Sequence, residues 1–218
     1  MTAPLPPSAN VARPGDGPRL HAPAAARNTA PLTDLLLAHA PATGRALELA
    51  SGTGQHVCAF ARALPGLSWL PTEPDPARRA SINAHAADAG LPNIAPARAL
   101  DATRPGWGEA MGPVDLILLI NLLHLIDISG ARTLVSEAAR ALAPAGKLIL
   151  YGPFSRAGQL TSEGDRRFDA ELRAADPTLG YKDDLDIRRW LGDAGLTDRA
   201  CVEMPANNLA FVAQKPAP

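Results

Sequence analysis

The stretch Ala46-Leu47-Glu48-Leu49-Ala50-Ser51-Gly52-Thr53-Gly54-Gln55-His56 decides the fold of this chain. A short apolar run with one acid breaks at a Gly-x-Gly turn, and residues 57–64 then place apolar side chains at helical spacing. This order is typical of a strand, a tight loop and a helix whose first N–H groups point back at the loop. Because Glu48 puts a carboxylate near the end of the strand, the pattern favours a ligand with hydroxyls and a positive group over a bare polyphosphate.

The segments on either side of this loop alternate between strand and helix patterns. A helix starts at Arg27-Asn28-Thr29, has Pro31 in its first turn and ends before Pro41. The expected elements that follow are a strand at 45–50, a helix at 55–64, a strand at 67–73, a helix at 77–89, a weaker strand at 94–100, a loop at 103–112, a strand at 114–120, a helix at 130–142 and a strand at 147–151. This order predicts an α/β fold with a doubly wound, mostly parallel sheet.

The two ends of the chain depart from this alternation. Residues 1–24 are rich in Pro, Ala and Gly without periodicity, so we expect a flexible arm before a single domain at 25–218. Residues 155–195 form a helical insert, with helix starts at Ser162 and at Asp183-Asp184, which covers the acceptor side. Two strand-like runs at 199–204 and 209–214 predict an antiparallel hairpin that adds an edge to the sheet.

Composition excludes several classes of function. The chain has 218 residues, a formal net charge of −1 and no long basic run, which argues against a nucleic-acid groove. The apolar run 116–120 is too short to span a bilayer. Cys58 and Cys201 have no metal-ligand spacing, and Glu73 and Asp75 have no further ligands to complete an oxygen shell, so no metal site is expected. The absence of a secretory signal indicates a reducing, cytoplasmic setting, whereas the oligomeric state stays open.

Polar residues follow the predicted strands at the points where ligands of such sheets bind. They are Ser51 to Gly54, Glu73, Asp101, Asn121 and Tyr151. The nicotinamide fingerprint G-x-G-x-x-G/A lacks its third small residue, because Val57 stands there. Several acids around one pocket suit a sulfonium cation better than a pyrophosphate. The pattern therefore favours S-adenosylmethionine, with Glu73 accepting from the ribose hydroxyls and Asp101 from the adenine amino group.

Five segments in order carry a family resemblance: Ala26-Arg27-Asn28, residues 47–56, Ile120-Asn121-Leu122-Leu123-His124, Tyr151-Gly152-Pro153-Phe154 and Met204-Pro205-Ala206-Asn207-Asn208. Over residues 25–215 the chain resembles class I S-adenosylmethionine-dependent methyltransferases and, more narrowly, the methyltransferase-like protein 26 family and its bacterial relatives. It departs at Thr72-Glu73-Pro74-Asp75, where that family usually has Ser-Asp-x-Asp. The resemblance implies a Rossmann-like fold, S-adenosylmethionine as cofactor and S-adenosylhomocysteine as product, but no particular substrate.

Each segment contributes candidate site residues. The expected cofactor contacts are Arg27, Asn28, Glu48, Ser51, Gly52, Thr53, Gly54, His56, Glu73, Pro74, Asp101, Ala102 and Asn121. Asn121, His124 and Tyr151 are catalytic candidates, with His124 as a general base because an unperturbed histidine titrates near neutrality. Tyr151, Asn207 and Asn208 are candidate acceptor contacts. The plainer alternatives are a structural His124, a capping or helix-surface His56 and a simple turn at Asn207-Asn208.

The expected activity is methyl transfer to an O, N or S atom of a small-molecule acceptor. Two alternatives stay open: a protein that binds S-adenosylmethionine without transferring its methyl group, and a nicotinamide-dependent oxidoreductase.

Overall fold

The computed structural model describes residues 6, 9 and 11–217, and a single mixed sheet forms its centre. The strands lie in the order β4-β3-β5-β6-β9-β8, and β7 pairs with the end of β6. Their bounds are β3 (Gly44–Leu49), β4 (Leu67–Pro71), β5 (Val114–Ile120), β6 (Leu142–Ser155), β7 (Lys182–Asp183), β8 (Thr197–Glu203) and β9 (Asn208–Gln214). Strands β4, β3, β5 and β6 are parallel, and β9 runs antiparallel to both β6 and β8. The predicted fold class, including the antiparallel C-terminal hairpin, is confirmed.

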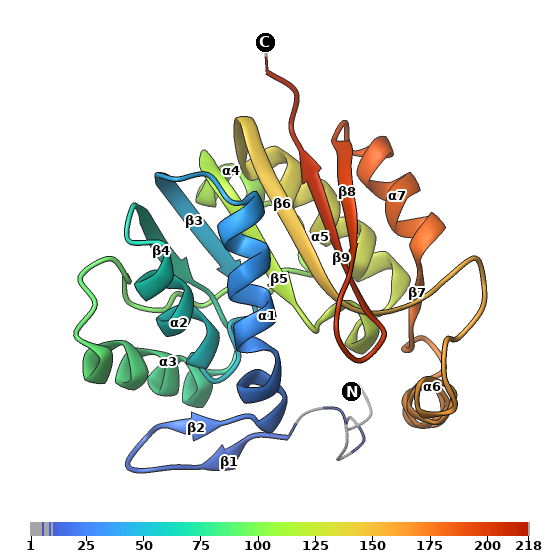
Figure 1. Cartoon of the computed structure of the whole chain (residues 1–218), viewed down its shortest axis with the longest axis horizontal. Coiled ribbons are helices and arrows are strands. Elements are labelled where there is room, and N and C mark those ends of the chain that lie inside the picture. The colour runs from blue at the N-terminus through green and yellow to red at the C-terminus, as the bar shows by residue number, and fades with distance from the viewer. Residues whose placement is uncertain (1–5, 7–8, 10, 218) are drawn as a thin grey trace.

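Helices cover both faces of the sheet (Figure 1). On one face lie α1 (Pro23–His39), α2 (Gln55–Ala63) and α3 (Pro76–Ala89). On the other lie α4 (Trp107–Met111), α5 (Ile128–Ala141) and α7 (Asp184–Asp193). A short 3₁₀ helix, η1 (Leu123–Leu125), follows β5, and α6 (Glu163–Ala175) stands apart from the two helical layers. This arrangement leaves the carboxyl ends of the parallel strands open between the layers.

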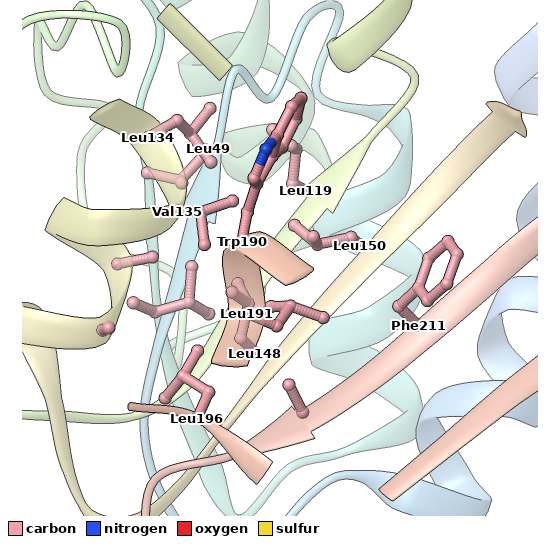
Figure 2. Packing of buried hydrophobic residues seen from close by; sticks show 14 of the residues in the cluster. Leu49, Leu119, Leu134, Val135, Leu148, Leu150, Trp190, Leu191, Leu196 and Phe211 are labelled. Carbon is pink, nitrogen blue, oxygen red and sulfur yellow. The ribbon is translucent and has the colours of Figure 1, made fainter. Parts of the chain in front are cut away.

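Successive residues of the strands alternate between two buried clusters because side chains alternate across a strand. Leu49, Leu119 and Leu150 pack with α5 and α7, where Trp190 and Leu191 complete the cluster (Figure 2). On the opposite face, strand residues 46, 116, 118 and 149 pack against α1 and α2. Both faces of the sheet are thus apolar, which explains the unbroken apolar run at residues 116–120 of β5.

Two helix starts match the sequence prediction. Ser162 accepts from Asp165 N–H, and the Asp165 side chain accepts in return from Ser162 N–H, which makes a capping box at α6. Asp183 accepts from Leu185 N–H at the start of α7. These local hydrogen bonds place α6 and α7 where the sequence puts them.

Three predictions about local structure are wrong. Helix α1 begins at Pro23, so Pro31 lies inside the helix rather than in its first turn. Residues 94–100 form two isolated bridges, to Trp69 of β4 and to Thr72 just after it, instead of a strand. Between the bridges Pro71 has no N–H to donate to residue 95, and Ala97 N–H donates to Asn83 Oδ1 instead. The predicted loop at 103–112 contains α4, where the Trp107 side chain packs into the core.

The N-terminal segment also has regular structure where none is expected from the sequence. Strands β1 (Arg13–Pro14) and β2 (Leu20–His21) form an antiparallel hairpin. The predicted flexible arm at 1–24 falls partly on residues 1–5, 7–8 and 10, which lie outside the described residues. Over residues 11–24 a hairpin and the start of α1 stand in place of the arm.

Candidate functional site

A cleft of about 390 Å³ opens beyond the carboxyl ends of β3, β4 and β5. One wall consists of the ends of these strands and the loop after β3. A second wall consists of the N-terminal segment, and residues 100–103, residues 120–122 and Leu125 complete the lining. The predicted site residues that line the cleft are Glu48, Ser51, Gly52, Thr53, His56, Glu73, Pro74, Asp101, Ala102 and Asn121. The three acids expected to surround one ligand therefore do border one cleft.

The loop after β3 keeps its shape through two glycines with positive φ. Gly54 has a φ of 91°, and a Cβ atom there would come within 2.6 Å of Ile82 Cα in α3. Gly52 has a φ of 61°, and the nearest atom to its position is 3.9 Å away. Gly54 does not line the cleft, and its lack of a side chain allows α3 to approach the loop closely. Gly52 does line the cleft, and its lack of a side chain leaves the backbone accessible to a ligand.

Glu48 is a buried acid with one oxygen unpaired. Its exposure is 2%, and Oε2 has no hydrogen-bond partner among the described residues. Burial is the main reason why the pKa of Glu48 is raised to about 8. A hydrogen bond with Ser51 lowers this pKa, and the nearby Glu73 carboxyl raises it. A cation in the cleft would give this carboxylate the partner that the protein does not supply, and binding would ionise it.

Glu73 holds the glycine loop to the end of β4. Its Oε2 accepts from Gly52 N–H at 3.0 Å and its Oε1 accepts from Asp75 N–H at 3.3 Å. Burial raises the pKa of this carboxyl, although the two backbone hydrogen bonds oppose the shift. Each oxygen keeps further acceptor capacity toward the cleft, because a carboxylate offers about four lone-pair sites.

Asp101 lines the cleft and also stabilises its own turn. Its Oδ1 accepts from Thr103 N–H at 3.0 Å and from Thr103 Oγ1 at 2.6 Å. Burial alone would raise the pKa of Asp101, but these bonds and the charge of Arg104 outweigh it and hold the pKa below its usual range. The acid is therefore ionised, and Oδ2 pairs with Arg104 at 3.5 Å on the exposed side.

Asn28 connects three elements next to the cleft. With its amide nitrogen directed at His56 Nε2 (2.8 Å) and at the carbonyls of Ala24 and Ala25, its oxygen accepts from Asn121 Nδ2 at 3.2 Å. The ring of His56 stacks on Phe60, and burial lowers its pKa to about 4, so the imidazole is neutral at physiological pH. Asn28 itself does not line the cleft. It orients His56 and Asn121, which do.

Tyr151 and Asn208 continue this polar group toward the C-terminal hairpin. Asn208 Nδ2 donates to the Tyr151 hydroxyl at 3.0 Å, and the Asn28 side chain also bonds to that hydroxyl. The neighbouring Asn207 donates to Asp165 Oδ2 at 3.1 Å and so ties the hairpin to α6. Burial raises the pKa of Tyr151. None of Tyr151, Asn207 and Asn208 lines the cleft. Tyr151 is connected to it through Asn28, which bonds to Asn121 in the lining.

His124 lies in η1, outside the cleft lining. Its ring packs edge-on against Phe168 of α6 and against Tyr181, at centroid distances of 5.7 Å and 6.3 Å. Burial and the nearby charge of Lys182 lower its pKa to about 3, and Nδ1 has no partner within the described part of the chain. A neutral imidazole of this kind takes up a proton weakly. Nothing tests the predicted role of His124 as a base, and its low pKa and ring contacts favour the alternative of a packed structural side chain.

Sequence reasoning missed one wall of the cleft, and three of the expected cofactor contacts, Arg27, Asn28 and Gly54, do not line it. Arg27 is exposed on α1 and does not line the cleft. The residues that were not expected there include Ala9, Val11, Ala12, Ala22, Ala24, Ala25, Asp75, Arg78, Leu100, Thr103, Leu122 and Leu125. The alanines of the N-terminal segment have no periodic pattern, so only their place in the fold identifies them.

Residues 6, 9 and 11–217 contain neither a candidate metal cluster nor a candidate membrane-spanning helix. No group of three or more His, Cys, Asp or Glu side chains there could hold a metal ion. No helix in that part of the chain is both long and apolar enough to cross a membrane.

Three solved structures with a similar fold are described as methyltransferases. An O-methyltransferase family protein from Burkholderia thailandensis matches with a TM-score of 0.74 and 18% identity, over 89% of this chain and 58% of that one. CalO1, a methyltransferase of calicheamicin biosynthesis solved with S-adenosylhomocysteine bound, matches with a TM-score of 0.68 and 18% identity, over 88% and 54%. An O-methyltransferase family 2 protein from Planctomyces limnophilus, solved with apigenin, matches with a TM-score of 0.69 and 19% identity, over 87% and 61%.

These likenesses establish the fold of class I methyltransferases, and the chain spans a little over half the length of the solved proteins. The family model that matches covers residues 19–215, nearly the whole of the described structure. Its match begins within the N-terminal hairpin and includes both the strand ends and the C-terminal hairpin. The chain therefore belongs to the protein family of unknown function DUF938.

Proposed function

We propose that this protein transfers the methyl group of S-adenosylmethionine to a small-molecule acceptor. The observation that carries the proposal is the common cleft of Glu48, Glu73 and Asp101 beside the glycine loop, with Glu48 Oε2 unpaired. Glu48 gains its negative charge most readily beside a cation, so the cleft favours a sulfonium or an ammonium group over a bare polyphosphate. The fold shared with methyltransferases supports the same cofactor.

S-adenosylmethionine supplies an electrophilic methyl group: an acceptor lone pair forms the new bond to carbon as the carbon–sulfur bond breaks, and the sulfonium becomes a neutral thioether. The residues of the chain bind S-adenosylmethionine and orient it toward the acceptor. Glu48 balances positive charge, Glu73 accepts from the ribose hydroxyls, and Asp101 accepts from the adenine amino group. Asn121, held by Asn28, borders the side where the acceptor approaches. Alignment of this kind accounts for roughly 7–11 kcal/mol of a barrier.

The acceptor in this proposal is small and offers an O, N or S atom. A cleft of about 390 Å³ is within the usual range of roughly 300–1,000 Å³ for small-molecule sites. The apigenin in the Planctomyces protein is an acceptor-sized molecule of that kind. The acceptor proton leaves to water, since the neutral His124 and His56 take up protons weakly. The proposal includes a place near the methyltransferase-like protein 26 family and a reducing, cytoplasmic setting, which the free thiols Cys58 and Cys201 suit.

Calorimetric titration of the whole chain with S-adenosylmethionine, S-adenosylhomocysteine and NADH tests the cofactor. We expect saturable binding of the first two and none of NADH. Binding of NADH alone would overturn the proposal in favour of an oxidoreductase. A panel of phenols, amines and thiols, with released S-adenosylhomocysteine measured, then tests transfer: binding of the cofactor without release for any acceptor would indicate a binding protein without transferase activity.

A further inference from the structure

The N-terminal hairpin lies against the cofactor cleft at both of its ends. Val11 and Ala12 precede β1, Ala22 follows β2, and all three line the cleft together with Ala24 and Ala25 of α1. Val11 lines the cleft and is 42% exposed, so part of its apolar surface is free to contact a ligand. A ligand in the cleft would cover this side chain. The hairpin is therefore placed to contact whatever the strand ends bind.

A single buried hydroxyl joins the hairpin to the glycine loop. Ser81 of α3 is 0% exposed, and its Oγ donates to Thr53 O at 2.7 Å and accepts from Leu20 N–H at 2.8 Å. A second link runs beside it, where Gln55 Oε1 accepts from Ala22 N–H at 2.6 Å and from Thr53 Oγ1 at 2.9 Å. The position of the hairpin and the position of the loop are thus set by the same two side chains.

The tip of the hairpin is held further along α3, beyond the reach of the cleft. Arg19 pairs with Asp88 at 2.8 Å, and His85 Nε2 bonds to Leu20 O at 2.9 Å. Figure 1 shows the hairpin at the base of the molecule, next to α3. Asp88 has 67% of its side chain exposed, so this outer contact is weak by itself. Neither Arg19 nor Asp88 lines the cleft, so substitutions there leave the lining side chains unchanged.

We propose that residues 11–25 form a closing wall of the cofactor site, and that Ser81 is the positioning residue that couples this wall to the glycine loop. The inference rests on the proposed function, because the ligand enclosed is S-adenosylmethionine or its product. Docking of the hairpin on α3 holds Val11 and Ala12 over the ligand. Release of the ligand then requires the hairpin to leave α3, so the hairpin sets the residence time more than it sets the encounter rate.

The test measures association and dissociation rates of S-adenosylhomocysteine by surface plasmon resonance on the immobilised full chain. Arg19→Glu places like charges at the outer contact, and we expect it to raise the dissociation rate three- to tenfold with an association rate within twofold. The double variant Arg19→Glu/Asp88→Arg restores an opposite-charge pair and should return the dissociation rate to within twofold of the wild type. Ser81→Ala removes the inner link and should raise the dissociation rate at least as much as Arg19→Glu.

Arg189→Glu is the matched control, because Arg189 makes a comparable exposed pair with Asp186 on α7, across the sheet. Thermal unfolding without ligand separates a docking effect from lost stability: Arg19→Glu should unfold at the same temperature as Arg189→Glu. Equal dissociation rates in all variants would overturn the role of the hairpin while leaving the cofactor site intact. A wild-type chain that does not bind S-adenosylhomocysteine at all would instead overturn the proposed function.

Discussion

The two walls of the cleft are built in different ways. The wall at the strand ends has buried acids and residues with left-handed backbone, Ala50 with a φ of 50° and Asn121 with a φ of 55°, all fixed by the sheet behind them. The N-terminal wall has mainly alanines and is attached through a few hydrogen bonds to α2 and α3. The difference indicates that the two walls have different roles. The strand ends recognise the charge of the ligand and set its affinity, while the N-terminal wall contacts the ligand and sets its dissociation rate.

The largest expected effect is at the strand ends. Glu48→Gln keeps the shape of the side chain but removes the charge, and we expect the affinity for S-adenosylmethionine to fall about 100-fold, since losing one partner of a buried charge pair costs roughly 2–5 kcal/mol. Calorimetry measures both this variant and Val11→Ala in the other wall, where the loss should stay below about tenfold. Equal losses in the two variants would break the distinction between the walls.

A second prediction concerns the rigidity of the strand-end wall. Gly54→Ala should lower the free energy of unfolding by about 3 kcal/mol, because the added Cβ meets Ile82 Cα at 2.6 Å in a backbone with positive φ. Gly52→Ala is the matched variant, with open space around it, and should cost only about 1 kcal/mol. Urea denaturation measures both. If Gly52→Ala proved the more costly, close packing of the loop on α3 would not be what fixes this wall.

A third prediction follows from the pKa of Glu48, which burial raises to about 8. The free protein holds the proton at pH 7 and a cationic ligand displaces it, so the affinity for S-adenosylmethionine should rise up to about tenfold per pH unit between pH 6 and 8 and level off above. Calorimetry in buffers of different ionisation enthalpy should detect release of the proton. Glu48→Gln should release none, and a wild type without proton release would contradict the assignment.

The same carboxyl links pH to stability. Its pKa in the folded state lies above its unfolded value, so the protonated acid stabilises the fold fully below about pH 4.5, and this contribution is lost as the pH rises through about 8. Glu48→Gln should therefore unfold at a higher temperature than the wild type at pH 9 and at a similar temperature at pH 5.

The smallest expected effect is at His124, which belongs to neither wall. His124→Gln should leave the affinity for S-adenosylhomocysteine within twofold and lower turnover less than about tenfold, because the ring with a pKa of about 3 is neutral over the working range. The pH profile of kcat/KM should keep its shape. A loss of turnover of 100-fold or more, with a changed profile, would establish His124 as the base.

The sequence predicts the strand-end wall well because each acid lies at the end of a predicted apolar run, although residues 94–100 before Asp101 form only isolated bridges. Glu48, Glu73 and Asp101 are found from the apolar runs before them, and parallel strands bring their ends to one edge. The hydrogen-bond partners of a site residue are harder to predict than its position in the fold. The sequence marks Asn28 as a site residue, but only the fold shows that its amide bonds to His56 and Asn121 instead of facing the cleft.

The N-terminal wall cannot be predicted in the same way. Strands β1 and β2 have two residues each, which is too short for an alternating pattern. Proline and alanine in this segment suggest a tail, and the hydrogen bonds that order it come from Ser81 and Gln55, more than thirty residues away. The third predicted strand fails because Pro71 of β4 has no N–H for residue 95 and the N–H of Ala97 donates to Asn83 instead.

The position of β9 between β6 and β8 has a consequence for the order in which the molecule assembles. As the chain leaves the ribosome, β6 is made long before β9, and one side of its backbone must wait unpaired until residues 208–214 arrive. The apolar row at 148–151 would meanwhile be open to pairing with another nascent chain. Premature termination near residue 207 should thus yield aggregates rather than a smaller folded protein.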